Sequence, residues 1–408
     1  MRLFSHSCTV SFVLVFLAPA SAQTVLTEAE ALARVSLESP RIRAIRAQLD
    51  LARADSLAAS RWPNPAVTFN RESVSGVTES FMLVSQPLPV TGRRRLAGQS
   101  ASAEASATGL RVDDLIRRIH ADARRAFVDL SAEQMRAREL TSALADIRAL
   151  AAVLAAREAA GDAAGFDRLR AEREALDIDA SLAETRARVA RAQGALARFF
   201  FPVPDPRDLH AAPLTGERAP IPGPDDLAER AEAARPDLLA LERDIEAARL
   251  AGDAALRSRI PEPEVVAGLK TSSARDSRNG SVVSLVVSIP LFDRARPERA
   301  RADARERLAA AERDALRAEI GAAVRALRHE TEERRAAADT FRQAGLTASD
   351  ALRRIAQLSY DAGERSILEL LDAYRAASDA RVRLIELEIA AAHAEIDLEL
   401  ATAVEIRR

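Results

Sequence analysis

The side chains of this chain that could do chemistry are mainly carboxylates that follow two glycines. Glu369 and Asp372 lie three residues apart beyond Gly363, so a helix would present both carboxylates on one face. The matching stretch after Gly161 keeps one acid, Asp167. Paired carboxylates can serve acid–base catalysis or attract cations, but in a chain with 29% charged residues most charges lie on a solvated helix face.

No enzyme or metal motif accompanies these acids. The sequence contains no GxSxG elbow, phosphate-binding glycine loop, HExxH helix or dinucleotide fingerprint. His120, His210, His329 and His393 occur singly, without the spacing of metal ligands, and the only cysteine is Cys8. We therefore expect no catalytic residue, no metal site and no cofactor.

The first 22 residues have the pattern of a cleaved export signal. Arg2 precedes an apolar run over residues 10–17, and Ala20-Ser21-Ala22 offers a small-residue cleavage site before Gln23. Cys8 precedes the apolar run, so it is not expected to carry a lipid. The mature protein would have no thiol and hence no disulfide.

Charge and hydropathy limit which kinds of partner and which kinds of membrane segment the sequence allows. A formal net charge of −2 gives no basic footprint for nucleic acid. After the signal, no apolar run is long enough for a membrane-spanning helix. Any crossing of a membrane would therefore have to use strands.

The elements that position the acids form an internal repeat. Each half is expected to begin with an amphipathic helix, 27–60 and 225–258, the first capped by Thr27 with Glu30. A pair of prolines then ends each helix. The pairs are Pro63 and Pro65, and Pro261 and Pro263.

A strand hairpin follows in each half. The predicted strands are 66–72 and 79–86 around Ser75-Gly76, and 264–271 and 281–289 around a turn that holds Asn279-Gly280. Val283, Leu285, Val287 and Ile289 alternate with Ser284 and Ser288, so the last strand has one apolar face.

Very long helices complete each half. Helices over 94–160 and 297–362 would each be on the order of 100 Å long. Gly161 and Gly363 are expected to end them as left-handed caps, and helices return to about 198 and 405. We predict a signal at 1–22, a first repeat at 23–198, a proline-rich linker at 199–224 and a second repeat at 225–408.

The last helix has a heptad seam of alternating large and small side chains. Its members are Leu370, Ala373, Ala377, Ala380, Leu384, Leu387, Ala391, Ala394 and Leu398. Frequent alanine permits close approach of antiparallel helices in a wall. The fold class expected is mainly α, with long antiparallel coiled-coil helices and a small β part.

Four strands are too few to close a membrane barrel, which needs about eight. If these strands enter a membrane, several subunits must pool them, because open edges in lipid are costly.

The duplication and several short segments resemble a known protein family. From about Leu26 onward, the chain resembles the TolC-type outer-membrane efflux proteins. The resemblance rests on the duplication, on the hairpin exits Ser85-Gln86-Pro87-Leu88-Pro89 and Ser288-Ile289-Pro290-Leu291-Phe292, and on the turn that begins at Tyr360. It implies a homotrimer that pools four strands per subunit into a twelve-stranded β-barrel in outer-membrane lipid, above a helical tunnel. It also implies two partners, a periplasmic adaptor and an inner-membrane pump.

The resemblance also implies roles for the two helical turns. In the family such turns dock the adaptor, which assigns that role here to Gly161, Asp162, Gly363, Glu364, Arg365 and Ser366. Glu369, Asp372 and Asp167 would form negative rings at a periplasmic gate, favouring cations and resisting closure. Simple helix capping and solvated charge are the competing explanations.

The stretch from Gln86 to Arg94 resembles the heavy-metal-cation branch of the family, which suggests cations as cargo. Two other classes remain open. A periplasmic adaptor would show one helical hairpin flanked by β-rich segments, and a soluble coiled coil would leave the strand alternation and the export signal unexplained.

Overall fold

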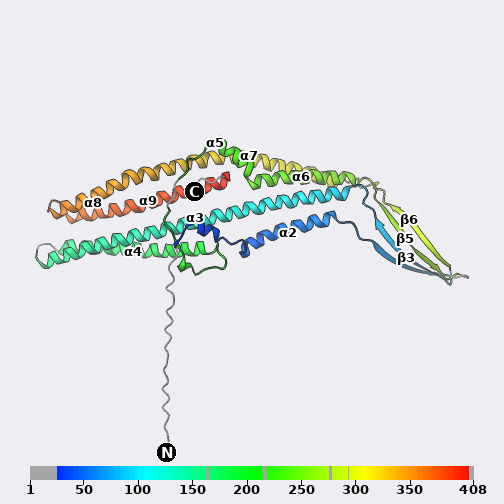
Figure 1. Cartoon of the computed structure of the whole chain (residues 1–408), viewed down its shortest axis with the longest axis horizontal. Helices are drawn as coiled ribbons and strands as arrows, with labels where there is room; N and C mark the ends of the chain where they lie inside the picture. Colours follow the sequence, from blue (N-terminus) through cyan, green and yellow to red (C-terminus); the bar gives the residue numbers. More distant parts are fainter. Residues whose placement is uncertain (1–24, 162–164, 215–217, 275–277, 293, 404–408) are drawn as a thin grey trace, which may run out of the picture.

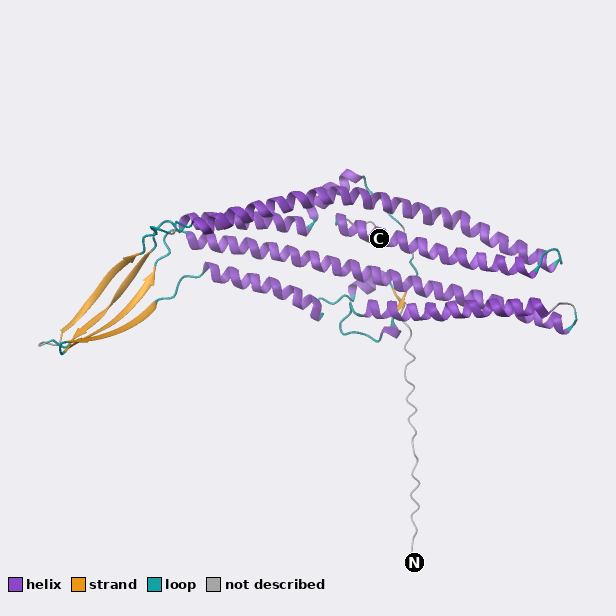
Figure 2. Cartoon of the chain, turned by 180° about the vertical axis from the view of Figure 1, so that it is seen from behind, coloured by secondary structure: helices purple, strands orange, loops and turns teal. Residues whose placement is uncertain are grey.

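The computed structural model describes residues 25–161, 165–214, 218–274, 278–292 and 294–403. Long helices run nearly side by side, and the strands lie at the end opposite to the α3–α4 and α8–α9 turns (Figure 1). Figure 2 shows the same division, with strands only at that end apart from one short pair near the middle. The predicted export signal at 1–22 lies outside the described residues.

The first half of the chain holds two short helices, a strand hairpin and one helical hairpin. Its elements are β1 (Val25–Leu26), α1 (Glu28–Ala33), α2 (Pro40–Ser60), β2 (Ala66–Val74), β3 (Val77–Pro87), α3 (Arg93–Ala159) and α4 (Gly165–Ala197). The capping box of Thr27 and Glu30 is confirmed, since the Thr27 backbone N–H donates to the Glu30 carboxylate at 2.8 Å.

The second half repeats this order after a connecting segment. That segment contains a 3-10 turn, η1 (Pro206–Asp208), and β4 (His210–Ala211), which pairs in parallel with β1. The later elements are α5 (Pro224–Ala234), α6 (Pro236–Arg257), β5 (Pro263–Ser272), β6 (Arg278–Val287), α7 (Arg296–Thr340), the π-helical turn η2 (Phe341–Gly345), α8 (Leu346–Asp361) and α9 (Ile367–Thr402).

The expectation of one continuous helix at the start of each half is wrong. The structure breaks both segments at a proline, giving α1 and α2 before and after Pro40, and α5 and α6 at Pro236. Proline has no backbone N–H and clashes with the preceding turn, so it begins a new helix instead of continuing the old one. Ser39 caps α2 by accepting the Ile42 N–H at 3.3 Å.

The four main strands form one antiparallel sheet in the order β2-β3-β5-β6. The two hairpins join through β3 and β5, where Phe81 stands opposite Lys270. The turn at Ser75-Gly76 is confirmed, with φ of 52° and 84° at its two residues. Such a two-residue turn needs positive φ, which glycine adopts without strain.

The turn predicted at Asn279-Gly280 is wrong. Both residues lie inside β6, opposite Thr271 and Lys270 in β5, and the strands stay paired as far as Ser272 and Arg278. Residues 275–277, beyond that last pair, lie outside the described chain. An Asn-Gly pair favours a tight turn, but here the longer strand pairing outweighs that local preference.

The two long helical hairpins end as the glycines predict. Gly161 and Gly363 have φ of 82° and 76°. At the second turn, the Glu364 N–H donates to the Ser359 carbonyl at 2.9 Å and the Gly363 N–H to the Tyr360 carbonyl at 3.0 Å. This is the Schellman pattern, which satisfies two carbonyls at the end of α8.

The predicted seam of α9 is largely buried against α3, α7 and α8. Leu370, Ala377, Ala391 and Leu398 are at most 2% exposed, whereas Leu384 and Leu387 are only half-buried. Small residues between larger ones let the helices approach closely.

Charged pairs are buried midway along the helical body. Glu395 in α9 is 1% exposed, and its carboxylate accepts from Arg335 in α7 at 2.7 Å. Arg218 of the connecting segment reaches the same oxygen at 3.3 Å. Glu395 therefore joins α7, α9 and the segment that links the two repeats.

We predict that Arg335→Met lowers the free energy of unfolding by about 3–5 kcal/mol, because it leaves a buried carboxylate without its main partner. Thermal and denaturant unfolding followed by circular dichroism in detergent would measure the loss. Arg243→Met removes an exposed pair with Glu246 on α6 and should change the value by about 0.5 kcal/mol or less. Equal losses in the two variants would contradict this account.

Candidate functional site

The sheet has two chemically different faces. Because side chains alternate along a strand, the observed register assigns each residue to one face. One face carries Val67, Phe69, Met82, Val84, Val265, Ala267, Leu269, Val283, Leu285 and Val287, and is the apolar face. The predicted alternation in β6 is confirmed over 283–287.

The opposite face, the polar face, carries nearly all the charge of the sheet. Its charged members are Glu72, Glu79, Glu264, Lys270 and Arg278, whereas Arg71 alone among the charged strand residues lies on the apolar face. Thr68, Asn70 and Ser85 also lie on the polar face. Leu83, Val266, Val282 and Val286 lie on this face too, so the two faces differ mainly in their charge.

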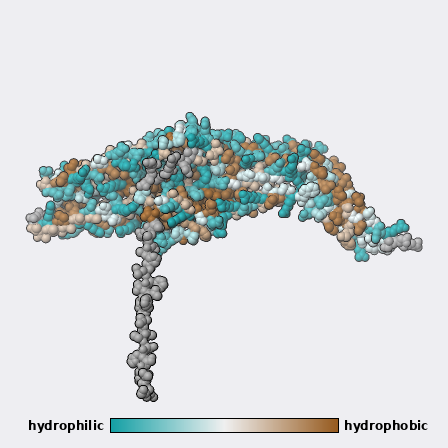
Figure 3. Space-filling view, in the orientation of Figure 1, coloured by the Kyte–Doolittle hydropathy of each residue, from teal (hydrophilic) through white to brown (hydrophobic). Residues whose placement is uncertain are grey.

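The apolar face is open in the single chain. Phe69 is 68% exposed and Val283 is 79% exposed. Figure 3 shows hydrophobic residues gathered over the strands and their junction with the helices, while the helical body is mostly hydrophilic. An apolar surface of this extent normally marks contact with a partner or with lipid.

Large apolar side chains also mark the junction between strands and helices. Trp62 before β2 and Val90 after β3 are both exposed, as are Ile289, Leu291 and Phe292 after β6. Phe292 is 98% exposed. Aromatic residues at this level are typical of a membrane–water interface. No helix among the described residues has the length and hydrophobicity to span a bilayer.

At the other end of the body, the two hairpin turns lie close together. Arg157 near the end of α3 lies 4.0 Å from Asp361 at the end of α8, and its guanidinium lies over the Tyr360 ring at 5.8 Å. Gly161 belongs to the first turn, and Asp162 lies outside the described residues. Glu364, Arg365 and Ser366 form the exposed second turn.

Glu369 is held by the start of α9. Ser366 and Glu369 form a capping box, with the Ser366 backbone N–H donating to the carboxylate at 3.0 Å. Arg365 donates to its other oxygen at 2.8 Å. That backbone hydrogen bond, assisted by Arg365, lowers the pKa of Glu369. Glu369 therefore stays charged and is held on the face of α9 beside the turn.

The other two predicted gate residues lie on α9 and α4, the returning helices of the two hairpins. Asp372 is exposed on α9. Asp167 lies in the first turn of α4. The pKa of Tyr360 is raised mainly by burial of its ring and next by the negative charge of Asp167. Asp167 and Tyr360 therefore interact across the two hairpins, so both hairpins contribute acids to the same end of the molecule.

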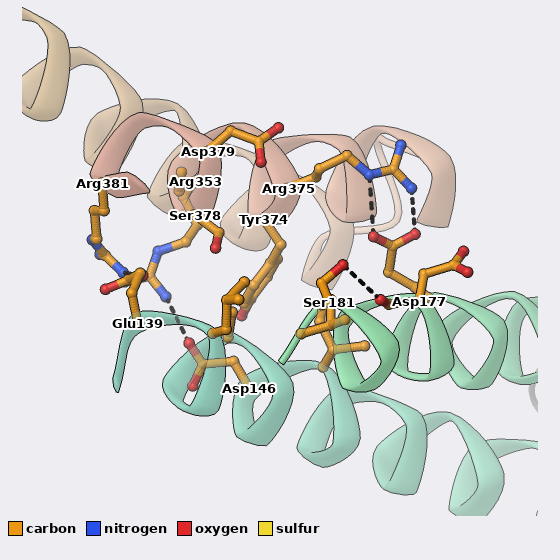
Figure 4. Close-up of a pocket in the computed structure, with 16 residues that line it drawn as sticks. Glu139, Asp146, Asp177, Ser181, Arg353, Tyr374, Arg375, Ser378, Asp379 and Arg381 are labelled. Carbon is orange, nitrogen blue, oxygen red and sulfur yellow. Dashed lines mark hydrogen bonds and ion pairs between the residues drawn. The ribbon is translucent and has the colours of Figure 1, made fainter. Parts of the chain in front are cut away.

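A groove between the hairpins was not foreseen from the sequence. It has a volume of about 320 Å³ and lies among α3, α4, α8 and α9. Arg375 pairs with Glu174 across it, Arg381 with Glu139 at 3.0 Å, and Arg353 with Asp146 at 3.6 Å (Figure 4). Burial raises the pKa of Asp379, which also lines it. Only the packing of both hairpins brings these distant residues together.

No three His, Cys, Asp or Glu side chains within the described ranges are arranged to bind a metal ion. His393 lies 3.0 Å from Asp129 as a single pair.

The described chain thus combines a long helical-hairpin body with a small sheet that has an exposed apolar face, and these two features can be compared with known proteins. Residues 227–404 match the family model described as outer membrane efflux protein. The cobalt-zinc-cadmium resistance protein CzcC of Cupriavidus metallidurans is 26% identical over 375 residues, which cover 90% of this chain and 87% of that protein.

Solved structures agree on the fold. The outer membrane protein VceC of Vibrio cholerae has a TM-score of 0.75 at 16% identity and covers 93% of this chain and 96% of its own. CusC, a transmembrane channel, has a TM-score of 0.75 at 15% identity, with 92% and 91% covered. The resemblance to the TolC-type outer-membrane efflux proteins is thereby confirmed.

Proposed function

We propose that this chain is one subunit of an outer-membrane efflux channel, through which cargo leaves the cell. The two-faced sheet is the single observation that supports this most directly. Its apolar face suits lipid, and its polar face suits a water-filled pore. The family match of residues 227–404 points to the same activity.

The channel would be a homotrimer. The sheet ends at β2 and β6, and each of these strands has one described neighbour, so each chain leaves two edges to be paired. Pairing β2 of one subunit with β6 of the next would close twelve strands from three chains, which removes every edge from lipid. The export signal expected at residues 1–22 would deliver the chain to the periplasm.

The helical body would then form a tunnel in the periplasm. α3 has 67 residues, which corresponds to about 100 Å of helix. The turns at Gly161 and Gly363, with Glu364, Arg365 and Ser366, would meet a periplasmic adaptor that links the tunnel to an inner-membrane pump. Exposed turns on a rigid scaffold are frequent binding sites.

Glu369, Asp372 and Asp167 would line the periplasmic entrance as negative rings. Three subunits would bring together three copies of each carboxylate, a source of cation preference. The similarity to a cobalt-zinc-cadmium resistance protein supports divalent metal cations as cargo.

The lipid-facing assignment is tested by two neighbouring residues of β6. Leu285→Arg places a charge on the apolar face and should cost about 2–4 kcal/mol in the membrane, because lipid cannot solvate it. Ser284→Arg places the same charge on the polar face and should be tolerated. Recovery of each variant as heat-modifiable oligomer from outer membranes measures the difference, and equal recovery would refute the two-faced membrane sheet.

The gate proposal is tested by removing charge while keeping the cap of α9. Combined Glu369→Gln and Asp372→Asn should lower the preference for K⁺ over Cl⁻ in planar bilayers, because the rings lose their negative charge. Glutamine at position 369 can still accept from Ser366, so the cap of α9 is kept. Asp226→Asn with Glu229→Gln, also three apart on an exposed face of α5, is the matched control and should change nothing. An unaltered preference in the first variant would remove these acids from the gate.

A further inference from the structure

Lys270 is the only lysine in the chain. All its other strongly basic residues are arginines. It lies in β5, a central strand, on the polar face. Phe81 in β3 and Gly280 in β6 are its register partners. The register of the sheet therefore points Lys270 to the side that the proposed function assigns to the pore.

Two neighbours in β3 hold the lysine. Its Nζ lies 2.8 Å from a Glu79 carboxylate oxygen, and it lies 5.0 Å from the centre of the Phe81 ring. A carboxylate and an aromatic face both attract an ammonium group. The side chains of Lys270 and Glu79 remain 36% and 32% exposed, so the pair still contacts solvent.

The position opposite Lys270 in β6 is Gly280, which carries no side chain. A Cβ added to Gly280 would meet no atom within 4 Å, so there is open space at that position. The next row on the polar face crosses all four strands through Glu72, Glu79, Ser272 and Arg278. Charged groups are thus concentrated where the pore wall would approach its turn end.

We propose that Lys270, held by Glu79 and Phe81, lines the pore and sets its preference between cations and anions. This inference rests on the proposed function, since it needs the polar face to enclose water. Each subunit of a trimer would contribute one such set, giving a ring near the outer end of the barrel. The ammonium offsets the nearby carboxylates, so the ring moderates the cation preference that glutamates alone would create.

The lysine ammonium suits this role better than a guanidinium would. It is a compact charge on a flexible stem, so it can follow Glu79 without filling the lumen. Its removal would leave the Glu79 carboxylate without that partner on the pore side, and the local field would become more negative.

The test is the reversal potential of the full-length channel in planar bilayers under a KCl gradient. Lys270→Gln should raise the K⁺/Cl⁻ permeability ratio at least about twofold, because Coulomb's law gives about that factor for a single unit charge about 8 Å from an ion's path in water, and a trimer carries three. Glu79→Gln should lower the ratio, and the double variant should lie near the wild type. Arg71→Gln removes a charge one residue before Glu72 but on the apolar face, so it should leave the ratio unchanged.

Chemical modification provides a route that does not depend on a folded variant. Because Lys270 is the only lysine, acetylation of the assembled wild-type channel neutralises one defined side-chain amine, which mass spectrometry can verify. It should reproduce the shift of Lys270→Gln. Channels that conduct with an unchanged ratio after both treatments would overturn this inference, whereas a wild type that forms no channels would contradict the proposed function itself.

Discussion

The structure depends on one constraint, which is that a four-stranded sheet with an exposed apolar face and two open edges is unstable alone in water. Phe69, Leu285 and Val283 are all more than half exposed in the single chain. Both edges, β2 and β6, offer backbone hydrogen-bonding groups to a further strand. Lipid around the sheet and neighbouring copies at its edges would satisfy both demands together.

The helical body differs from the sheet, because its surface is largely hydrophilic and its core is narrow. Alanine and leucine share the seam of α9, and buried charge pairs such as Arg335–Glu395 add specific contacts between helices. Such pairs stabilise little in net terms, but they fix which helices meet, since a mismatched partner would leave a buried charge. A rigid body of this kind can hold the sheet and the hairpin turns at a constant separation.

Much of this organisation was predictable from the sequence, because the glycines and prolines that separate the elements of each repeat are local signals. Gly161 and Gly363, the prolines before each strand hairpin, and the Thr27 cap all act within a few residues of where they stand. Pro40 and Pro236 are local signals too, because a proline inside a helical pattern indicates that one helix ends and a new one begins there. The turn predicted at Asn279-Gly280 is wrong because strand pairing outweighs the local turn preference of these two residues. The groove between the hairpins and the Lys270–Glu79 pair join residues about 190 or more positions apart, so no pattern along the chain predicts their contact.

The most direct test of the central claim is the native mass of the protein extracted in detergent from purified outer membranes. We expect a trimer, because three copies would pair every edge strand of the sheet and enclose the polar face. A monomer or dimer recovered from the soluble periplasmic fraction would contradict it, since the apolar face would then need a different cover.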